Sequence, residues 1–200
     1  RQLEEKECLH VYFNGCAGNV AAGKYNDGSP EMRPVLTERI YRGILASEDN
    51  LQPEPIEQVD WKKVDMLPTA RSSLSKKILQ HEISNKQNSL VKRLSPAYQL
   101  SWLHRLEEKL PIAMSAMHIN GISMLHLPAE CFVQYQLRAQ KMRPSRFVAT
   151  AAYGDGGPWY IPTKEEFILG GYEVGQAYCE PGIDGLITRG LESLFDSFNA

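Results

Sequence analysis

The chain has 200 residues, a formal net charge of -2 and a sequence pI near 6.2. Hydrophobic residues make up 42% and charged residues 23% of it, which excludes an intrinsically disordered chain and allows one domain with a core. The near-neutral charge excludes a generally basic surface for nucleic acid, and no stretch reaches the roughly 18–20 apolar residues of a transmembrane segment.

The start of the chain carries neither a methionine nor a signal-peptide pattern, and a strand-like segment over residues 9–13 follows within a few residues. A processed natural protein can begin in this way. We expect instead that the sequence is part of a longer chain, so the missing leader says nothing about compartment. Residues 1–200 are therefore expected to form a single domain or part of one.

The first half predicts a strand, a loop and three helices. The strand over residues 9–13 ends at Asn14-Gly15, and the loop that follows is rich in glycine, which allows tight turns or a close approach to a ligand. Helices are expected over residues 33–46, 73–83 and 96–108, with an extended segment over 59–64.

The stretch from residue 71 to residue 109 is the basic part of the chain. It holds eight Lys and Arg residues against three Glu residues, a net charge of +5. A charge run on helices usually forms a solvated face, and the alternative is contact with an anionic surface or partner.

The second half contains the clearest local signal. Two apolar runs, 112–119 and 122–127, flank Asn120-Gly121, which is the strongest short signature of a β-hairpin. Helices are expected over residues 132–141, 164–167 and 183–198, with a buried-type strand over 147–153. The expected fold class is α/β, a mixed sheet with an antiparallel hairpin at 112–127 flanked by helices.

The cysteines and histidines do not form a recognisable metal motif. No Cys-x-x-C pair joins Cys8, Cys16, Cys131 and Cys179, so we expect isolated small apolar residues, with one disulfide as the alternative. Across the hairpin, His118 should lie opposite Met124 or its neighbours rather than opposite His126.

A phosphate-binding motif is ruled out for the loop after the first strand. Residues 18–24 match G-x-x-x-x-G-K, but Tyr25 stands where a Ser or Thr must bind magnesium. Turn sequence follows where a helix should begin, so an NTPase is not expected.

Three residues in the second half, at the ends of two strands, carry side chains that could take part in chemistry. Glu130 follows an apolar strand, where a carboxylate either caps the next helix or projects into a cleft as a metal ligand. Asp155 and Tyr160 belong to a loop at the end of another strand, a common place for sites in α/β folds. The alternative for this loop is simple aromatic packing.

Three segments together are similar to the neutral/alkaline non-lysosomal ceramidase family. Residues 126–132, His-Leu-Pro-Ala-Glu-Cys-Phe, resemble the family's strand that ends in Pro-Gly/Ala-Glu-Phe. Residues 160–167 and 170–173 resemble its Tyr-Val/Ile-Thr-Thr-x-Glu-Glu-Tyr segment and the Tyr-Glu-Gly downstream, and residues 13–20 resemble its loop ending in Gly-Asp-Val-Ser-Pro-Asn. The resemblance implies a remote homologue that covers the C-terminal portion of a ceramidase-like catalytic domain.

The resemblance implies a zinc site with oxygen ligands. It assigns the family's zinc-binding glutamate to Glu130 and its zinc-binding tyrosine to Tyr160, and it places two histidine ligands upstream of this sequence. Asn19 stands at the family's aspartate and is, with Tyr160, the candidate catalytic residue. Gly18 and Asp155 are the candidate substrate-binding residues.

One departure from the family pattern divides the functional hypotheses. Ala21 stands in place of the family serine and offers no hydroxyl for amide cleavage. The first hypothesis is a zinc-dependent hydrolase acting on an amide or related bond of a small or lipid-like substrate. The alternatives are a non-catalytic ceramidase-like binding protein and a structural domain without metal. The family resemblance favours an exported or periplasmic location.

Overall fold

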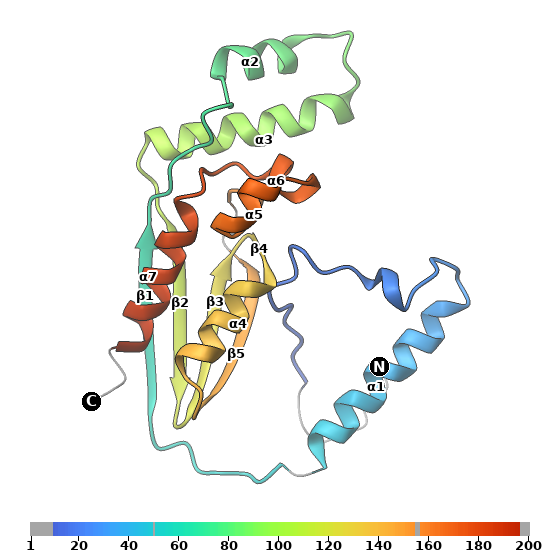
Figure 1. The fold of residues 1–200 in the computed structure, drawn as a ribbon, viewed down its shortest axis with the longest axis vertical. Helices are drawn as coiled ribbons and strands as arrows, with labels where there is room; N and C mark the ends of the chain where they lie inside the picture. The colour runs from blue at the N-terminus through green and yellow to red at the C-terminus, as the bar shows by residue number, and fades with distance from the viewer. Residues whose placement is uncertain (1–9, 50, 155–156, 197–200) are drawn as a thin grey trace.

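A four-stranded mixed sheet forms the centre of the molecule (Figure 1). The computed structural model describes residues 10–49, 51–154 and 157–196. The strands are β1 (Val59–Met66), β2 (Ile112–Ile119), β3 (Ile122–Pro128) and β5 (Phe147–Gly154), in the order β1-β2-β3-β5. The first two pairings are antiparallel and the third is parallel. The expected mixed α/β fold is confirmed.

The β2–β3 hairpin turns at Asn120-Gly121, as its sequence predicts. Asn120 has a positive φ of 50°, and its side chain holds the segment before β1. Its Oδ1 accepts hydrogen bonds from the backbone N–H groups of Glu57 (3.0 Å) and Gln58 (3.1 Å). The hairpin register places His118 opposite Ser123, and therefore away from His126, as expected.

Two helices, α4 (Val133–Met142) and α7 (Ile183–Asp196), pack on one face of the sheet, which we name the covered face. Met114 and Leu125 point to this side and are buried. Gly190 lets α7 approach closely, because a Cβ there would lie 2.8 Å from the Met114 sulfur. The apolar side of α7 thus supplies much of the core.

The opposite side, which we name the open face, is also apolar. Directly paired residues in neighbouring strands share a face, so the register forms two apolar rows across it. The rows are Val59, Ile119, Ile122 and Phe147, and Trp61, Met117, Met124 and Ala149. Trp61 is 62% exposed and Phe147 is 67% exposed.

Four helices and a short strand pair lie at one end of the sheet (Figure 1). The helices are α2 (Lys76–Ser84), α3 (Leu90–Glu107), α5 (Lys164–Leu169) and α6 (Tyr172–Gln176), and the pair is β4 (Glu130–Cys131) with β6 (Tyr160–Ile161). The helix expected from residue 96 begins six residues earlier, because Ser89 caps it by accepting a hydrogen bond from the Lys92 N–H. Pro96 consequently lies inside the helix.

The strand expected over residues 9–13 is wrong for residues 10–13, and residue 9 lies outside the described residues. Tyr12 and Phe13 are exposed, and the next contact with the sheet is one hydrogen bond from the Ala152 N–H to the Asn14 carbonyl (2.8 Å). The apolar, β-branched pattern predicts strand propensity, but a strand also needs a continuous ladder of partners.

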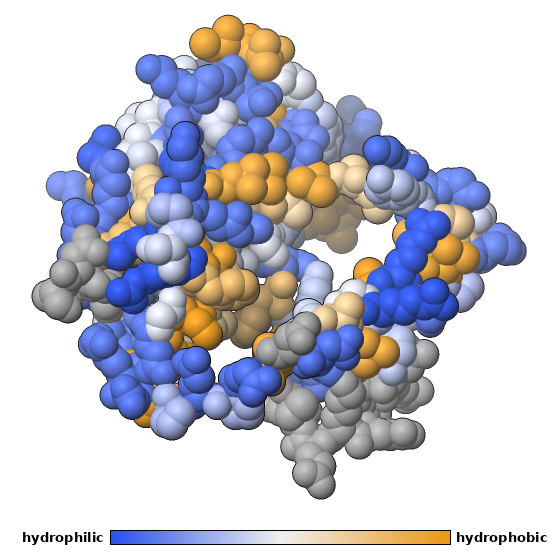
Figure 2. Space-filling view, turned by 60° about the horizontal axis from the view of Figure 1, so that its bottom comes forward, coloured by the Kyte–Doolittle hydropathy of each residue, from blue (hydrophilic) through white to orange (hydrophobic). Residues whose placement is uncertain are grey.

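Helix α1 (Met32–Glu48) lies on an arm that extends from the sheet. The expected helix is confirmed, but none of its residues is buried. Figure 2 shows an open gap between this arm and the rest of the molecule. Across the described residues, none of the helices has the length and apolar character needed to cross a membrane.

Candidate functional site

The structure brings Glu130 and Tyr160 together, and we name them the Glu130–Tyr160 pair. Strands β4 and β6 run parallel with these two residues in register. The Tyr160 hydroxyl and the Glu130 carboxylate lie close enough for each to influence the pKa of the other. The backbone reinforces the contact, because the Glu130 N–H donates to the Trp159 carbonyl at 3.0 Å. Two residues thirty positions apart thus present oxygen atoms to one place.

The backbone around the pair is strained at three residues. Ala129, Tyr153 and Trp159 have positive φ values of 54°, 64° and 65°, a region that residues with a Cβ rarely occupy. Hydrogen bonds hold two of them together, since the Tyr153 N–H donates to the Ala129 carbonyl and the Ala129 N–H donates to the Gly154 carbonyl, both at 2.9 Å. Such strain persists where the surroundings enforce it, and it clusters at functional sites.

Partial burial changes the acidity of both members of the pair. It raises the pKa of Glu130, and the nearby Glu173 carboxylate adds to this, while the neighbouring Tyr160 hydroxyl lowers the pKa. Burial, followed by the negative charge of Glu130, raises the pKa of Tyr160 to about 12. Tyr160 therefore carries its proton at neutral pH.

Tyr172 and Glu173 lie near the Glu130–Tyr160 pair and were not among the candidate residues that the sequence suggested. The ring of Tyr172 meets the ring of Tyr160 edge to face, with centroids 6.1 Å apart. Gly170 and Gly171, with φ values of 77° and 113°, make the turn that brings them there. The signal was available, because residues 170–173 form one of the segments that carry the family resemblance.

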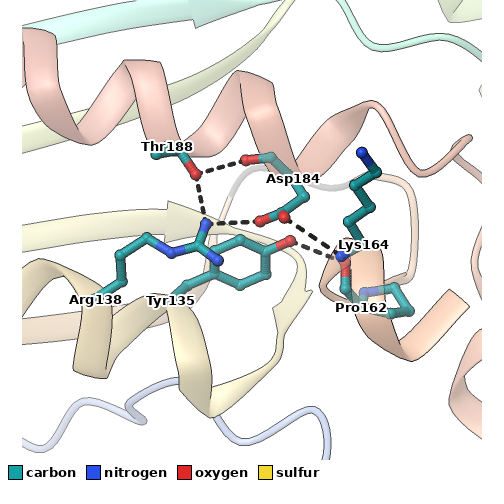
Figure 3. A network of polar contacts seen from close by, with 6 residues as sticks. All are labelled: Tyr135, Arg138, Pro162, Lys164, Asp184 and Thr188. Atoms are coloured by element: carbon teal, nitrogen blue, oxygen red, sulfur yellow. Dashed lines mark hydrogen bonds and ion pairs between the residues drawn. The ribbon is translucent and has the colours of Figure 1, made fainter.

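A partly buried polar network holds the segment after β6 in place (Figure 3). The Tyr135 hydroxyl donates to the Pro162 carbonyl at 2.8 Å. Asp184 accepts from Arg138 at 2.6 Å and from the Lys164 backbone N–H at 3.3 Å. These bonds join α4, α7 and the start of α5.

Thr188 completes this network. Its hydroxyl accepts from Arg138 and donates to the Asp184 carbonyl. The Arg138 guanidinium also lies over the Tyr135 ring, 5.2 Å from its centroid. Because the network fixes Pro162 and Lys164, it limits the movement of Tyr160 just before them. None of these residues was selected from the sequence, because their chemistry is common and only folding joins them.

Gly18 and Asn19 lie against β4 and α4. A Cβ on Gly18 would lie 2.6 Å from the Glu130 carbonyl oxygen, so glycine is needed for close contact with that strand. The Asn19 side chain accepts from the Val133 N–H and donates to Gln134, both at 2.9 Å. Asn19 thereby caps α4, the role that the sequence had also allowed for Glu130.

The remaining candidates lie outside the pair. Ala21 is exposed and precedes a single 3₁₀ turn over Ala22–Lys24. Asp155 lies outside the described residues. Cys16, Cys131 and Cys179 are buried free thiols.

The pair could supply two oxygen ligands to a metal ion, whereas a structural or catalytic zinc ion needs three or four protein ligands. Within the described ranges, no group of three or more His, Cys, Asp and Glu side chains could hold a metal ion. A carboxylate and a phenol oxygen in contact nevertheless fit one edge of such a site, because zinc accepts oxygen ligands.

Comparison with known proteins found a solved structure with a similar fold. No protein-family profile matches the chain, and no curated protein sequence does either. Neutral ceramidase from Pseudomonas aeruginosa matches 90% of the chain with a TM-score of 0.54 and 14% identity. A second solved structure, a ceramidase complexed with C2, matches 44% of the chain with a TM-score of 0.36 and 21% identity. The chain spans about a third of the neutral ceramidase chain, 35% of its length.

Proposed function

We propose that the chain carries part of the zinc site of a ceramidase-like hydrolase that acts on an amide or related bond of a lipid-like substrate. The observation that carries the proposal is the contact between Glu130 and Tyr160, which the sequence resemblance had assigned to one zinc ion. The fold similarity to neutral ceramidase supports it. The resemblance assigns the other two ligands to histidines outside these 200 residues.

The two residues have distinct roles in this proposal. Zinc would supply a Lewis acid that polarises a carbonyl and lowers the pKa of bound water toward about 7. Glu130 provides a carboxylate, and the parallel β4–β6 register holds it beside Tyr160. Tyr160 provides a phenol that ligates or, while protonated, donates to an oxygen that becomes negatively charged. Tyr172 packs against Tyr160 and limits its rotation.

Zinc binding at the pair has a direct spectroscopic test. A cation beside Tyr160 stabilises its phenolate. Zinc added to the full-length protein, which includes the histidines assigned by the resemblance, should therefore produce the ultraviolet difference spectrum of a tyrosinate at mildly alkaline pH. Tyr160→Phe should abolish this signal and Glu130→Gln should weaken it. Tyr172→Phe is the matched control and should retain it. Zinc binding that leaves the tyrosine spectrum of the wild-type chain unchanged would refute the ligand assignment.

Hydrolysis is tested separately, with a long-chain N-acyl amide as the probe. Release of the free fatty acid should stop after chelation of zinc. It should fall by about 100-fold or more in Tyr160→Phe, the usual loss when a donor to a developing oxyanion is removed. Turnover that persists after chelation contradicts the zinc-dependent reaction.

The second candidate function is a non-catalytic binding protein of the same fold. Ala21 supports it, because a methyl group cannot perform the step assigned to the family serine. Asn19 supports it as well, since both ends of its amide are engaged in capping α4. Zinc binding to the chain without chelator-sensitive turnover of amide or ester probes would favour this candidate.

A further inference from the structure

Two helices at the same end of the sheet as the Glu130–Tyr160 pair carry exposed apolar side chains. We name this surface the apolar rim, and it consists of Leu90, Val91, Leu94 and Tyr98 on α3 with Ile168 and Leu169 on α5. The most exposed members are Ile168 at 83%, Leu169 at 77% and Val91 at 76%. Several large apolar side chains exposed on two neighbouring elements are a feature of interaction sites.

Aromatic contacts connect the two parts of the rim across the pair. The Tyr98 ring stacks on Trp159 with centroids 5.6 Å apart, and Trp159 is the residue before Tyr160. The Tyr160 ring meets Tyr172, which follows the Gly170-Gly171 turn after α5. Figure 1 shows α3, α5 and α6 at the same end of the sheet. The two parts of the rim are therefore each linked to the pair through an aromatic neighbour, Trp159 on the α3 side and Tyr172 on the α5 side.

The residues of the rim on α3 follow one side of the helix. Positions 90, 91, 94 and 98 recur at the spacing of a single helical face. Of the buried residues of α3, Trp102 lies on the same side one turn after Tyr98, and Pro96 lies on a different side. The exposed stripe is thus the continuation, toward the start of α3, of the side by which Tyr98 and Trp102 pack on the molecule, and it is exposed where the helix extends beyond that packing.

Charge favours an anionic partner at this end. The segment that contains α2 and α3, residues 71–109, has a net charge of +5, whereas the whole chain has -2, so the remainder has -7. Lys86 and Lys92 are exposed near the start of the α3 stripe. The α5–α6 side is acidic, with Lys164 against Glu165, Glu166 and Glu173, so the attraction comes from the α2–α3 side.

We propose that the apolar rim docks the protein on a lipid bilayer that contains anionic lipids. Aliphatic side chains insert among acyl chains, while tyrosine and tryptophan rings prefer the boundary between lipid and water. Lysines beside the rim meet anionic headgroups. The proposal extends the proposed function, because a lipid-like substrate would then reach the pair from the surface on which the protein sits.

The test is co-flotation of the full chain with vesicles of phosphatidylcholine alone or mixed with phosphatidylserine. Wild type should bind the mixed vesicles more tightly, and added salt should weaken this binding. The double variants Leu90→Ser/Val91→Ser and Ile168→Ser/Leu169→Ser should each reduce binding by about tenfold or more. Lys86→Glu/Lys92→Glu should reduce binding to the mixed vesicles and leave binding to the phosphatidylcholine vesicles unchanged. Circular dichroism checks that each variant is folded, and the substituted side chains are exposed.

The matched control is Val59→Ser/Trp61→Ser on the open face, which should bind as wild type does. Loss of binding in this control alone, or no binding by wild type, overturns the proposal. Rim variants that bind vesicles normally but lose self-association or a protein partner also overturn it. Glu130→Gln separates the two proposals, because it should weaken the zinc signal and leave vesicle binding unchanged.

Discussion

The covered and open faces of the sheet come from the same strands but differ in burial. On β3, Leu125 points to the covered face and is 1% exposed, whereas Ile122 points to the open face and is 44% exposed. Both faces carry apolar side chains, and in the part of the chain that the structure describes only the covered face has helices packed on it. An apolar pattern therefore indicates what a face can bury, and the position of the helices decides what it does bury.

The largest expected effect tests this difference directly. Leu125→Ala should lower the free energy of unfolding by about 2–5 kcal/mol, because it removes buried contacts and leaves a cavity. Ile122→Ala is the matched change on the same strand and should cost less than about 1 kcal/mol, since that side chain is partly in water. Urea denaturation monitored by circular dichroism measures both. Equal losses would show that the open face is covered in solution.

A smaller effect is expected where the glycine-rich loop meets β4, at the end of the sheet. Gly18→Ala should destabilise the protein by about 1–3 kcal/mol, because its Cβ would meet the backbone carbonyl oxygen of Glu130. Gly23→Ala is the control, since a Cβ there has no neighbour within 4 Å. The same denaturation experiment measures the pair, and a neutral Gly18→Ala would contradict the close packing of this loop.

The cap of α4, a helix of the covered face, should contribute less. Asn19→Ala removes the acceptor for the Val133 N–H and should cost about 1 kcal/mol. Asn19→Asp retains an acceptor oxygen and should recover most of this loss. If both variants were as stable as wild type, Asn19 would not cap the helix in solution. The measurement is the urea concentration at the midpoint of unfolding, compared between variants whose unfolding free energy depends on urea with the same slope.

The smallest effect concerns pH. The pKa of Glu130 is raised on folding, so between its unfolded and folded values the native state binds more protons and stability falls as pH rises. The stabilising contribution is complete below the unfolded pKa and is lost as pH rises through the folded one. Glu130→Gln should remove this decline, so its melting temperature relative to wild type should increase from pH 4 to pH 7. A constant difference across this range would contradict the shift.

The local elements could be predicted because their signals lie within a few residues of one another. Asn120-Gly121 predicts the hairpin, since few other pairs adopt the turn it needs. The parallel pairing of β4 with β6 was not predicted, because two-residue strands have no periodicity to detect. The strand expected over residues 9–13 was wrong for residues 10–13, since propensity alone does not provide a pairing partner.

The residues of the candidate site also differ in whether the sequence could predict their roles. Glu130 and Tyr160 were selected because short motifs around them resemble one family, and the chemistry of a carboxylate and a phenol is readable from residue type. The roles of Gly18 and Asn19 were not readable, because their contacts with Glu130 and Val133 join residues more than a hundred positions apart.

By itself, the sequence determined the mixed α/β class, the hairpin and most helices, because each depends on local spacing, and its resemblance to one family supplied two candidate oxygen ligands. Tertiary structure alone decided that Glu130 and Tyr160 lie side by side, that Arg138 and Asp184 hold the segment beside them, and which face of the sheet is covered. The physical reason is that these features arise from contacts between distant segments, whose free energy depends on how the elements pack.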